Sequence, residues 1–457
     1  MKISEIHIKN FRQFEDLKLN LTYPKDHPTK AGRALDKVCI IGQSGTGKTT
    51  LLKILREGIL SSLYNTVPTV TNAIPKINFG ENEHVKVSCI QYLSNGIGVP
   101  NYKIGNRKED ENNKSRYKPK NPQITKQLLY FPENLTNVKD FEEIQFTSVE
   151  ERKKTDTLFQ LMSHFFYFEF NQDTAAALWR NHLNIINKHR NLEVDFRIAL
   201  TKRAEKESVD IKSAMEHWRA ENPNPLKKLA DECLDKLLNK LHLATKTEID
   251  SVEELNTIQI QLLKEGKTIP YQDLSTGTKQ ILYTAFPLYY LLQKDTIVLM
   301  DQPENSLYPD MQTQIVPFYL SLNKKEENET QFFFATHSPL IASSFEPWEI
   351  VELKFDEKGK VYREKYYTGE GTHIDDYFLD PRYLRWDSIL TKVFDLEEEG
   401  NTSFRAKKLM EFSILKNQLT TLKDEGKLLN PTPETQKTIE AYKKAGQLLD
   451  WTSLNGH

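Results

Sequence analysis

The chain has 457 residues, which is more than one hydrophobic core usually holds, so we expect two or three domains. Its 62 basic and 64 acidic residues give a net charge of −2, which does not indicate nucleic-acid binding as a bulk property but leaves DNA open as a partner of a local basic face. Cys39, Cys89 and Cys233 lack C-x-x-C spacing, which argues against a zinc site or a disulfide scaffold, and the absence of a signal-peptide core or a long apolar run leads us to expect a cytoplasmic protein with no membrane contact.

The N-terminal part predicts strands around a glycine-rich loop. Alternating residues in KISEIHI and FEDLKLNL indicate two strands. DKVCII then predicts a buried strand that leads into GQSGTGKTT and the helical segment LLKILREGILSSL. Further strands are expected within residues 76–105 and at QLLYFP, and residues 106–126 are interpreted as an exposed loop that is basic on balance.

Residues 150–245 differ in character and predict a helical insertion. The segment LFQLMSHFFYFEF is aromatic and expected to be buried, and a charged helical stretch then runs to the breaker NPNP. The last segment of the insertion has one apolar helical face, interpreted as core packing, formed by Leu226, Leu229, Cys233, Leu234, Leu237, Leu238 and Leu241.

Strands are predicted again after the insertion, with one long helix between them. TEIDSV, TIQIQLL and TIPYQDL predict short strands, STGTKQILYTAFPLYYLL a helix, and TIVLMDQ and QFFFA buried strands. The chain ends in charged helical sequence. We therefore expect an α/β head domain in two halves, residues 1–149 and 246–378, a helical insertion at 150–245 and a helical extension at 379–457.

The segment between the predicted strand and helix fits the phosphate-loop pattern G-x-x-x-x-G-K-[ST]. Its backbone N–H groups and the helix N-terminus would surround the phosphates of ATP, Lys48 would reach the β- and γ-phosphates, and the Thr49 hydroxyl would bind Mg²⁺. The predicted nucleotide-binding set is Gly42, Gln43, Ser44, Gly45, Thr46, Gly47, Lys48, Thr49 and Thr50.

A second motif follows the buried strand TIVLMD. Four apolar residues precede Asp301, a pattern typical of the strand whose terminal carboxylate completes the Mg²⁺ shell. A capping aspartate after an ordinary buried strand is the alternative, and the upstream phosphate loop favours the magnesium site.

Two further segments resemble motifs of the ABC-type ATPases. LSTGTKQ resembles the signature sequence LSGGQ that opens a helix before the Walker B strand, although a serine N-cap with a flexible glycine is the alternative. The resemblance implies that Ser275, Thr276 and Gly277 close on the γ-phosphate held by another subunit. It also implies that His337, after QFFFAT, is the switch histidine that contacts this phosphate.

The start of the chain narrows the resemblance to the SMC- and RecF-like branch. IKNFRQFEDLKLNL resembles its opening strands, which implies that Arg12 lies near the nucleotide, and DQPENSLYP and THSPLIASS resemble the overcoming-lysogenisation-defect and related AAA-type groups. The same branch implies a glutamine that contacts Mg²⁺, for which Gln127 is preferred over Gln91.

The resemblance implies a fold class and a function. We expect an α/β P-loop NTPase of ABC type, with a mixed central sheet, an antiparallel β subdomain and the helical insertion and extension. It would form a homodimer or higher homo-oligomer around ATP and Mg²⁺. WDSILTKVF is weakly similar to defence ATPases such as the Septu ATPase, which implies a separate effector, a nuclease or toxin, in anti-phage defence. A RecF-like DNA repair ATPase is the alternative.

Gln302 departs from the family pattern, which has a catalytic glutamate at this position. Glutamine can orient water but cannot accept its proton, so we expect tight ATP binding with slow hydrolysis. Glu304, two residues on, stays open as a substitute base. Either the glutamine is natural, as in a nucleotide-gated scaffold, or it replaces a glutamate to trap the bound state. The otherwise intact motifs favour the second explanation.

Overall fold

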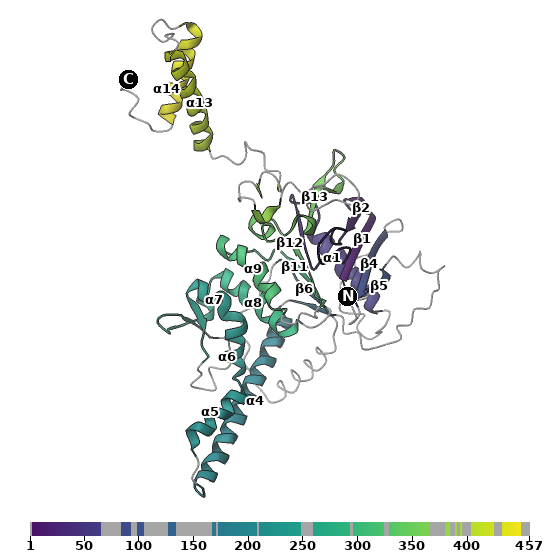
Figure 1. Cartoon of the computed structure of the whole chain (residues 1–457), viewed down its shortest axis with the longest axis vertical. Helices are drawn as coiled ribbons and strands as arrows, with labels where there is room; N and C mark the ends of the chain where they lie inside the picture. Colours follow the sequence, from purple (N-terminus) through teal and green to yellow (C-terminus); the bar gives the residue numbers. More distant parts are fainter. Residues whose placement is uncertain are drawn as a thin grey trace, which may run out of the picture. The chain divides into compact units, whose positions relative to one another are not determined.

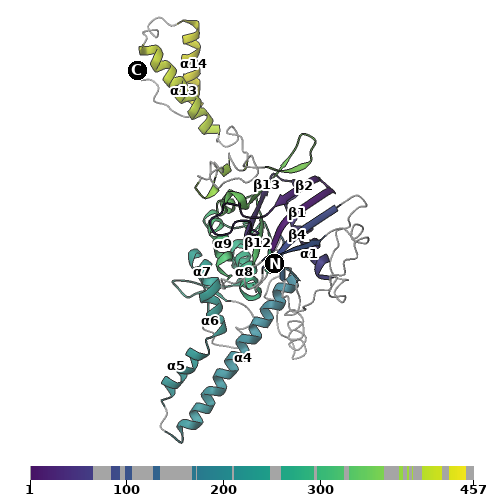
Figure 2. The ribbon, with the colours of Figure 1, turned by 45° about the vertical axis from the view of Figure 1, so that its right-hand side comes forward.

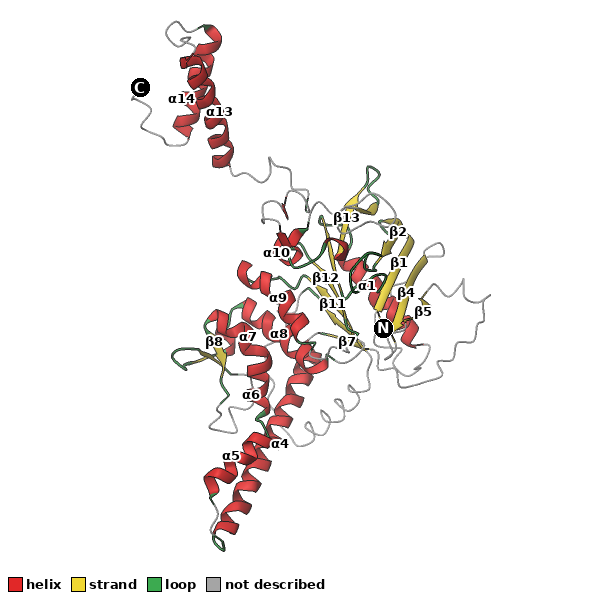
Figure 3. Ribbon diagram, in the orientation of Figure 1, coloured by secondary structure: helices red, strands yellow, loops and turns green. Residues whose placement is uncertain are grey.

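In the computed structural model, the described residues are 2–64, 84–92, 98–104, 127–133, 167–170, 172–207, 210–247, 259–292, 296–323, 329–364, 380–383, 389–390, 394, 404–424 and 432–448. The chain divides into two compact units, Met1–Tyr383 and Leu384–His457. In Figure 1 the ribbon is coloured along the sequence, and in Figure 3 it is coloured by secondary structure.

A seven-stranded mixed sheet forms the centre of the first unit, in the order β14-β13-β3-β12-β11-β6-β7. All neighbouring strands are parallel except β13 and β14, which form an antiparallel hairpin. Its strands are apolar because helices or another sheet cover both faces. They are β3 (Lys37–Gly42), β6 (Gln127–Phe131), β7 (Tyr167–Glu169), β11 (Thr296–Asp301), β12 (Gln331–Ala335), β13 (Ile350–Phe355) and β14 (Val361–Glu364).

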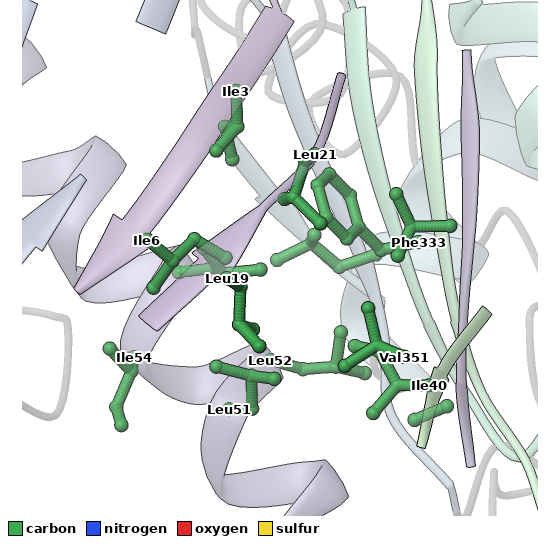
Figure 4. Packing of buried hydrophobic residues seen from close by; sticks show 14 of the residues in the cluster. Ile3, Ile6, Leu19, Leu21, Ile40, Leu51, Leu52, Ile54, Phe333 and Val351 are labelled. Carbon is green, nitrogen blue, oxygen red and sulfur yellow. The ribbon is translucent and has the colours of Figure 1, made fainter. Parts of the chain in front are cut away.

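An antiparallel sheet of four strands lies beside the mixed sheet (Figure 2), in the order β2-β1-β4-β5. Its strands are β1 (Lys2–Phe11), β2 (Phe14–Asn20), β4 (His84–Tyr92) and β5 (Gly98–Ile104). Helix α1 (Lys48–Tyr64) packs between the two sheets, and Figure 4 shows its leucines meeting residues of both. This shared core fixes the start of α1, and hence the phosphate loop, relative to β3 and β11.

A pair of helices forms what we call the helical arm. It consists of α4 (Gln172–Ala204) and α5 (Ile211–Glu221), which lie side by side in Figures 1 and 2. Arg219 pairs with Glu193, and Trp218 stacks on Phe196, so the two helices run antiparallel. Asp210 caps α5 by accepting two backbone N–H bonds.

A buried segment follows the arm and carries the leucine stripe. It comprises α6 (Pro225–Leu229), the π-helical turn η4 (Ala230–Leu234), α7 (Asp235–Leu238) and the 3₁₀ turn η5 (Asn239–Leu241). All stripe residues are buried except Leu241, which is half-buried. The Cys233 thiol donates to the carbonyl oxygen of Ala285, so the stripe is core packing against the next long helix.

The first unit also contains a small sheet, three further helices and three 3₁₀ turns. β8 (Leu243–Thr245), β9 (Ile260–Leu262) and β10 (Thr268–Ile269) form a small antiparallel sheet. The helices are α8 (Thr276–Leu291), α9 (Pro309–Ser321) and α10 (Pro339–Ala342), with 3₁₀ turns η7 (Tyr271–Asp273), η8 (Pro347–Glu349) and η10 (Pro381–Tyr383). Among the described helices, none is long and apolar enough to span a membrane.

The second unit contains α13 (Phe404–Asp424) and α14 (Pro433–Leu448). Phe412 stacks on Tyr442 with ring centroids 4.4 Å apart, and Ala445 completes a small buried cluster. The two helices therefore have a hydrophobic contact of their own.

The predicted fold class is confirmed, because the structure combines a mixed α/β sheet behind a phosphate loop with an antiparallel sheet and helices. One detail differs. β7 lies within the stretch assigned to the helical insertion, yet it pairs with β6 in the central sheet. The strands predicted at TEIDSV and the loop at 106–126 lie outside the described residues.

Candidate nucleotide-binding site

Three parallel strands bring the predicted site residues to one edge of the central sheet. Asp301 pairs in register with Ala335, and Ala335 with Ile40. The carboxyl ends of β3, β11 and β12 therefore lie next to one another, and the loops after them converge. The phosphate loop, Gln302 and His337 follow these three strands, which is why residues distant in sequence meet here.

The phosphate loop curls because three of its glycines take backbone conformations that other residues avoid. Gly42, Gly45 and Gly47 have φ angles of 148°, 88° and 90°. The Lys48 ammonium donates to the carbonyl oxygens of Gly42 and Gln43, at 2.8 and 3.1 Å. Burial lowers the pKa of Lys48 to about 8. A phosphate oxygen would stabilise the charged form of this lysine in place of the carbonyl dipoles.

One side chain of the phosphate loop is buried and holds the loop together, and others are exposed to solvent. The buried Thr46 hydroxyl donates to the Gln43 carbonyl oxygen at 2.8 Å and closes the loop from inside. Gln43, Ser44 and Gly45 are exposed, and Thr50 is half-buried in the first turn of α1. The open backbone of the loop is thus available to an anion.

Thr49 and Asp301 form a donor set suited to Mg²⁺. The Thr49 hydroxyl donates to Asp301 Oδ1 at 3.1 Å. Asp301 is buried, its Oδ2 atom is enclosed without a hydrogen-bond partner, and burial raises the pKa of its carboxyl to about 6. Mg²⁺ takes one or two carboxylates together with phosphate oxygens and water. A hydroxyl and a buried, unpaired carboxylate oxygen beside a phosphate loop fit this preference.

Gln302 has a backbone held from both sides. Its φ of 49° is left-handed, its N–H donates to the Ala335 carbonyl oxygen at 2.8 Å, and its own carbonyl oxygen accepts from Asn305 N–H at 3.1 Å. The side chain is half-buried. Residue 302 is therefore held by backbone hydrogen bonds directly beyond Asp301.

Glu304 joins the loop after β11 to the loop after β12. Its Oε1 atom accepts hydrogen bonds from the Thr336 hydroxyl at 2.6 Å and from the backbone N–H of His337 at 2.9 Å. The Oε2 atom is enclosed without a partner, and burial raises the pKa of the carboxyl. Glu304 thus joins the two loops through its Oε1 atom, next to the backbone of His337.

His337 lies at the same edge as the phosphate loop. Its side chain is exposed, and its pKa is lowered by partial burial and by the positive charge of Lys48. The side chains of Lys48 and His337 are therefore close enough for the lysine charge to affect the imidazole. A neutral imidazole beside the lysine can hydrogen-bond to a phosphate oxygen without adding charge repulsion to Lys48.

Gln127 does not belong to this site, which corrects the assignment of a magnesium contact to it. It opens β6 and pairs in register with Thr296, whereas Asp301 ends the parallel strand β11. At about 3.3 Å per residue, the two positions lie about 16 Å apart along the sheet. The side chain of Gln91, in β4, lies outside the described part of the chain.

The residue that β6 does bring to the site is Glu133, which the sequence reasoning missed. It follows the carboxyl end of β6, its charge raises the pKa of Asp301, and its carbonyl oxygen accepts from Asn305 Nδ2 at 3.3 Å. The signal was the end of QLLYFPE: a polar residue after a buried parallel strand faces the shared edge.

The turn between β1 and β2 lies against the phosphate loop. A Cβ added to Gly47 would stand 2.0 Å from the Gln13 amide nitrogen, so this side chain covers Gly47 closely. Arg12 precedes it in a left-handed conformation with an exposed side chain over the Phe11 ring. The structure thus places Gln13, which the motif did not single out, against the loop, and Arg12 next to it in the same turn.

The signature segment opens α8 as predicted for its local structure. Ser275 is the N-cap, and its hydroxyl oxygen accepts from Thr278 N–H at 3.2 Å. Ser275 and Thr276 are exposed. A Cβ on Gly277 would lie 2.4 Å from the Ser306 carbonyl oxygen, so this glycine lets α8 pack against the loop that follows Gln302. The serine is a cap, which leaves its predicted contact with a second subunit as a proposal.

The chain has similarities to solved structures and to a protein-family model. The Smc head domain of Pyrococcus furiosus, solved with an extended coiled coil and bound to the C-terminal domain of ScpA, is 12% identical with a TM-score of 0.35, over 79% of this chain and 96% of that one. The SMC head domain of Thermotoga maritima is 10% identical with a TM-score of 0.35, over 80% and 98%. No curated protein matches. Residues 1–342 match the family model described as the AAA ATPase domain, and the chain therefore belongs to this ATPase family.

Proposed function

We propose that this chain binds ATP and Mg²⁺ at the edge formed by β3, β11 and β12, and that it hydrolyses ATP slowly because residue 302 is glutamine. The Thr49–Asp301 pair beneath the open phosphate loop is the observation that supports this most directly. Lys48 would neutralise the β- and γ-phosphates, Glu304 would hold His337 towards the γ-phosphate, and Gln302 would orient water without taking its proton.

Replacing Lys48 with alanine should weaken ATP binding tenfold or more, because a charge-assisted hydrogen bond contributes about 1.5–3 kcal/mol. Isothermal titration with ATP and Mg²⁺ measures the effect. Lys18→Ala is the matched control, because it removes the same charge from an exposed position on β2. Equal affinities in the two variants would contradict nucleotide binding at this loop.

We further propose that two chains close around two ATP molecules, each offering the start of its α8 to the other's nucleotide. The exposure of Ser275 and Thr276 beside the loop after Gln302 supports this arrangement. Thr276→Arg places a long charged side chain there without removing the capping serine. The ATP-dependent dimer measured by mass photometry should fall at least tenfold in affinity while ATP binding is unchanged. A dimer of unchanged affinity would contradict this interface.

The role in anti-phage defence with a separate effector is also a proposal. Its support is the sequence similarity to defence ATPases, together with the helices α13 and α14, which lie beyond the matched ATPase region. Phage plating on cells that express the chain with its neighbouring genes, with Lys48 intact or replaced by alanine, tests it. Protection that is independent of Lys48, or hydrolysis stimulated by DNA, would instead favour the repair alternative.

A further inference from the structure

An aromatic side chain lies next to the phosphate loop and outside the motifs described so far. β13 runs parallel to β3, with Leu353 in register with Gly42. Phe355 is two residues further along and so lies beside the loop that follows Gly42. A Cβ added to Gly45 would be 3.7 Å from Phe355 Cζ, an ordinary van der Waals distance. The ring therefore lies beside the loop at Gly45.

The Phe355 ring is partly exposed, although its backbone is paired within the β13–β14 hairpin. Phe355 is 39% exposed, whereas Val361, its partner across the hairpin, is 3% exposed. Paired residues of antiparallel strands point to the same face, so Phe355 lies on the same face of the hairpin as the buried Val361. An exposed phenylalanine on a hydrogen-bonded hairpin loses little backbone entropy when a flat apolar group covers it.

A second element completes the surroundings of the ring. The Val361 N–H donates to the Gln13 carbonyl oxygen at 2.9 Å, which ties the hairpin to the turn between β1 and β2. The Gln13 side chain in turn covers Gly47. The phosphate loop is thus flanked by Phe355 near Gly45 and by Gln13 near Gly47, and both flanking residues are held by hydrogen-bonded backbone.

We infer that Phe355 is the stacking surface for the base of the bound nucleoside triphosphate. This rests on the proposed nucleotide site, since the loop must hold the phosphates for the base to reach the ring. Every nucleobase has a π-face, and stacking on an aromatic side chain is tolerant of base identity. Phe355 offers no hydrogen-bonding group, so its contribution should be similar for ATP and GTP.

Equilibrium titration of ATP, GTP and inorganic tripolyphosphate with Mg²⁺ tests the inference. Phe355→Ala should weaken ATP and GTP binding about tenfold or more and leave tripolyphosphate unchanged, because only the nucleotides carry a base. Phe355→Trp should restore ATP binding. Tyr362→Ala is the matched control, since Tyr362 is 41% exposed on the same hairpin but pairs with Lys354 on its other face.

The possible failures are distinguishable. Unchanged ATP binding in Phe355→Ala, or an equal loss for tripolyphosphate, would overturn the stacking role, the second result showing that the ring only supports the loop. Loss of ATP binding in Tyr362→Ala would show that the hairpin as a whole is responsible. If neither ATP nor tripolyphosphate binds the unaltered chain, the proposed nucleotide site itself fails.

Discussion

Replacing Gln302 with glutamate should raise the steady-state rate of ATP hydrolysis about a hundredfold or more, within the 10²- to 10⁴-fold range typical of a general base. The backbone at residue 302 is held by Ala335 and Asn305, so the new carboxylate takes the place of the amide without rearrangement. The Glu304 Oε1 atom is already bonded to Thr336 and His337. Phosphate release at saturating ATP and Mg²⁺ measures the rate.

The same experiment includes a control for added charge and a readout of assembly. Gln261→Glu makes the same chemical change on β9, in the small three-stranded sheet, and should leave the rate as it is. ATP should also hold the unaltered chain as a dimer longer than the Gln302→Glu variant, because hydrolysis would remove the ATP that the proposed dimer encloses. Equally slow hydrolysis in all three proteins, with assembly still driven by ATP, would make this a nucleotide-gated scaffold.

The phosphate loop was predictable from sequence because its chemistry is local. The glycines that need left-handed φ, the lysine and the threonine all lie within one strand–loop–helix segment, and the structure places them as expected. Asp301 was predictable for a related reason: a buried strand ends at it. Its hydrogen bond with Thr49 then follows from the parallel order of β3, β12 and β11.

The rest of the site depends on strand pairing, which the sequence does not contain. Gln127 was chosen for its position near the helical insertion, but the register of β6 places it at the opposite end of the sheet from Asp301. Glu133 became visible only when the direction of β6 was known. The contact of Phe355 with the phosphate loop likewise requires that β13 lie beside β3 rather than elsewhere in the sheet.

Glu304→Ala should lower the free energy of unfolding by about 2–4 kcal/mol, because it leaves the Thr336 hydroxyl and the His337 N–H without their acceptor and opens a space among buried atoms. Urea denaturation measures the loss. The Glu304→Gln variant keeps an oxygen for both donors and should stay within about 1 kcal/mol of the original. In the Gln302→Glu background, hydrolysis should fall with alanine at 304 and persist with glutamine, because only alanine releases His337.

The pH dependence separates the charge of Glu304 from its hydrogen bonds. Burial raises the pKa of Glu304 in the folded chain above the ordinary value of 4.5. At a pH between the unfolded and the folded pKa, the folded state therefore keeps a proton that the unfolded state has lost. The free energy of unfolding should therefore fall as pH rises through this window, and the fall should be smaller in Glu304→Gln, which does not titrate.

If Glu304→Ala matches Glu304→Gln in stability and rate, the carboxylate does not join the two loops, and His337 must be positioned by its strand alone.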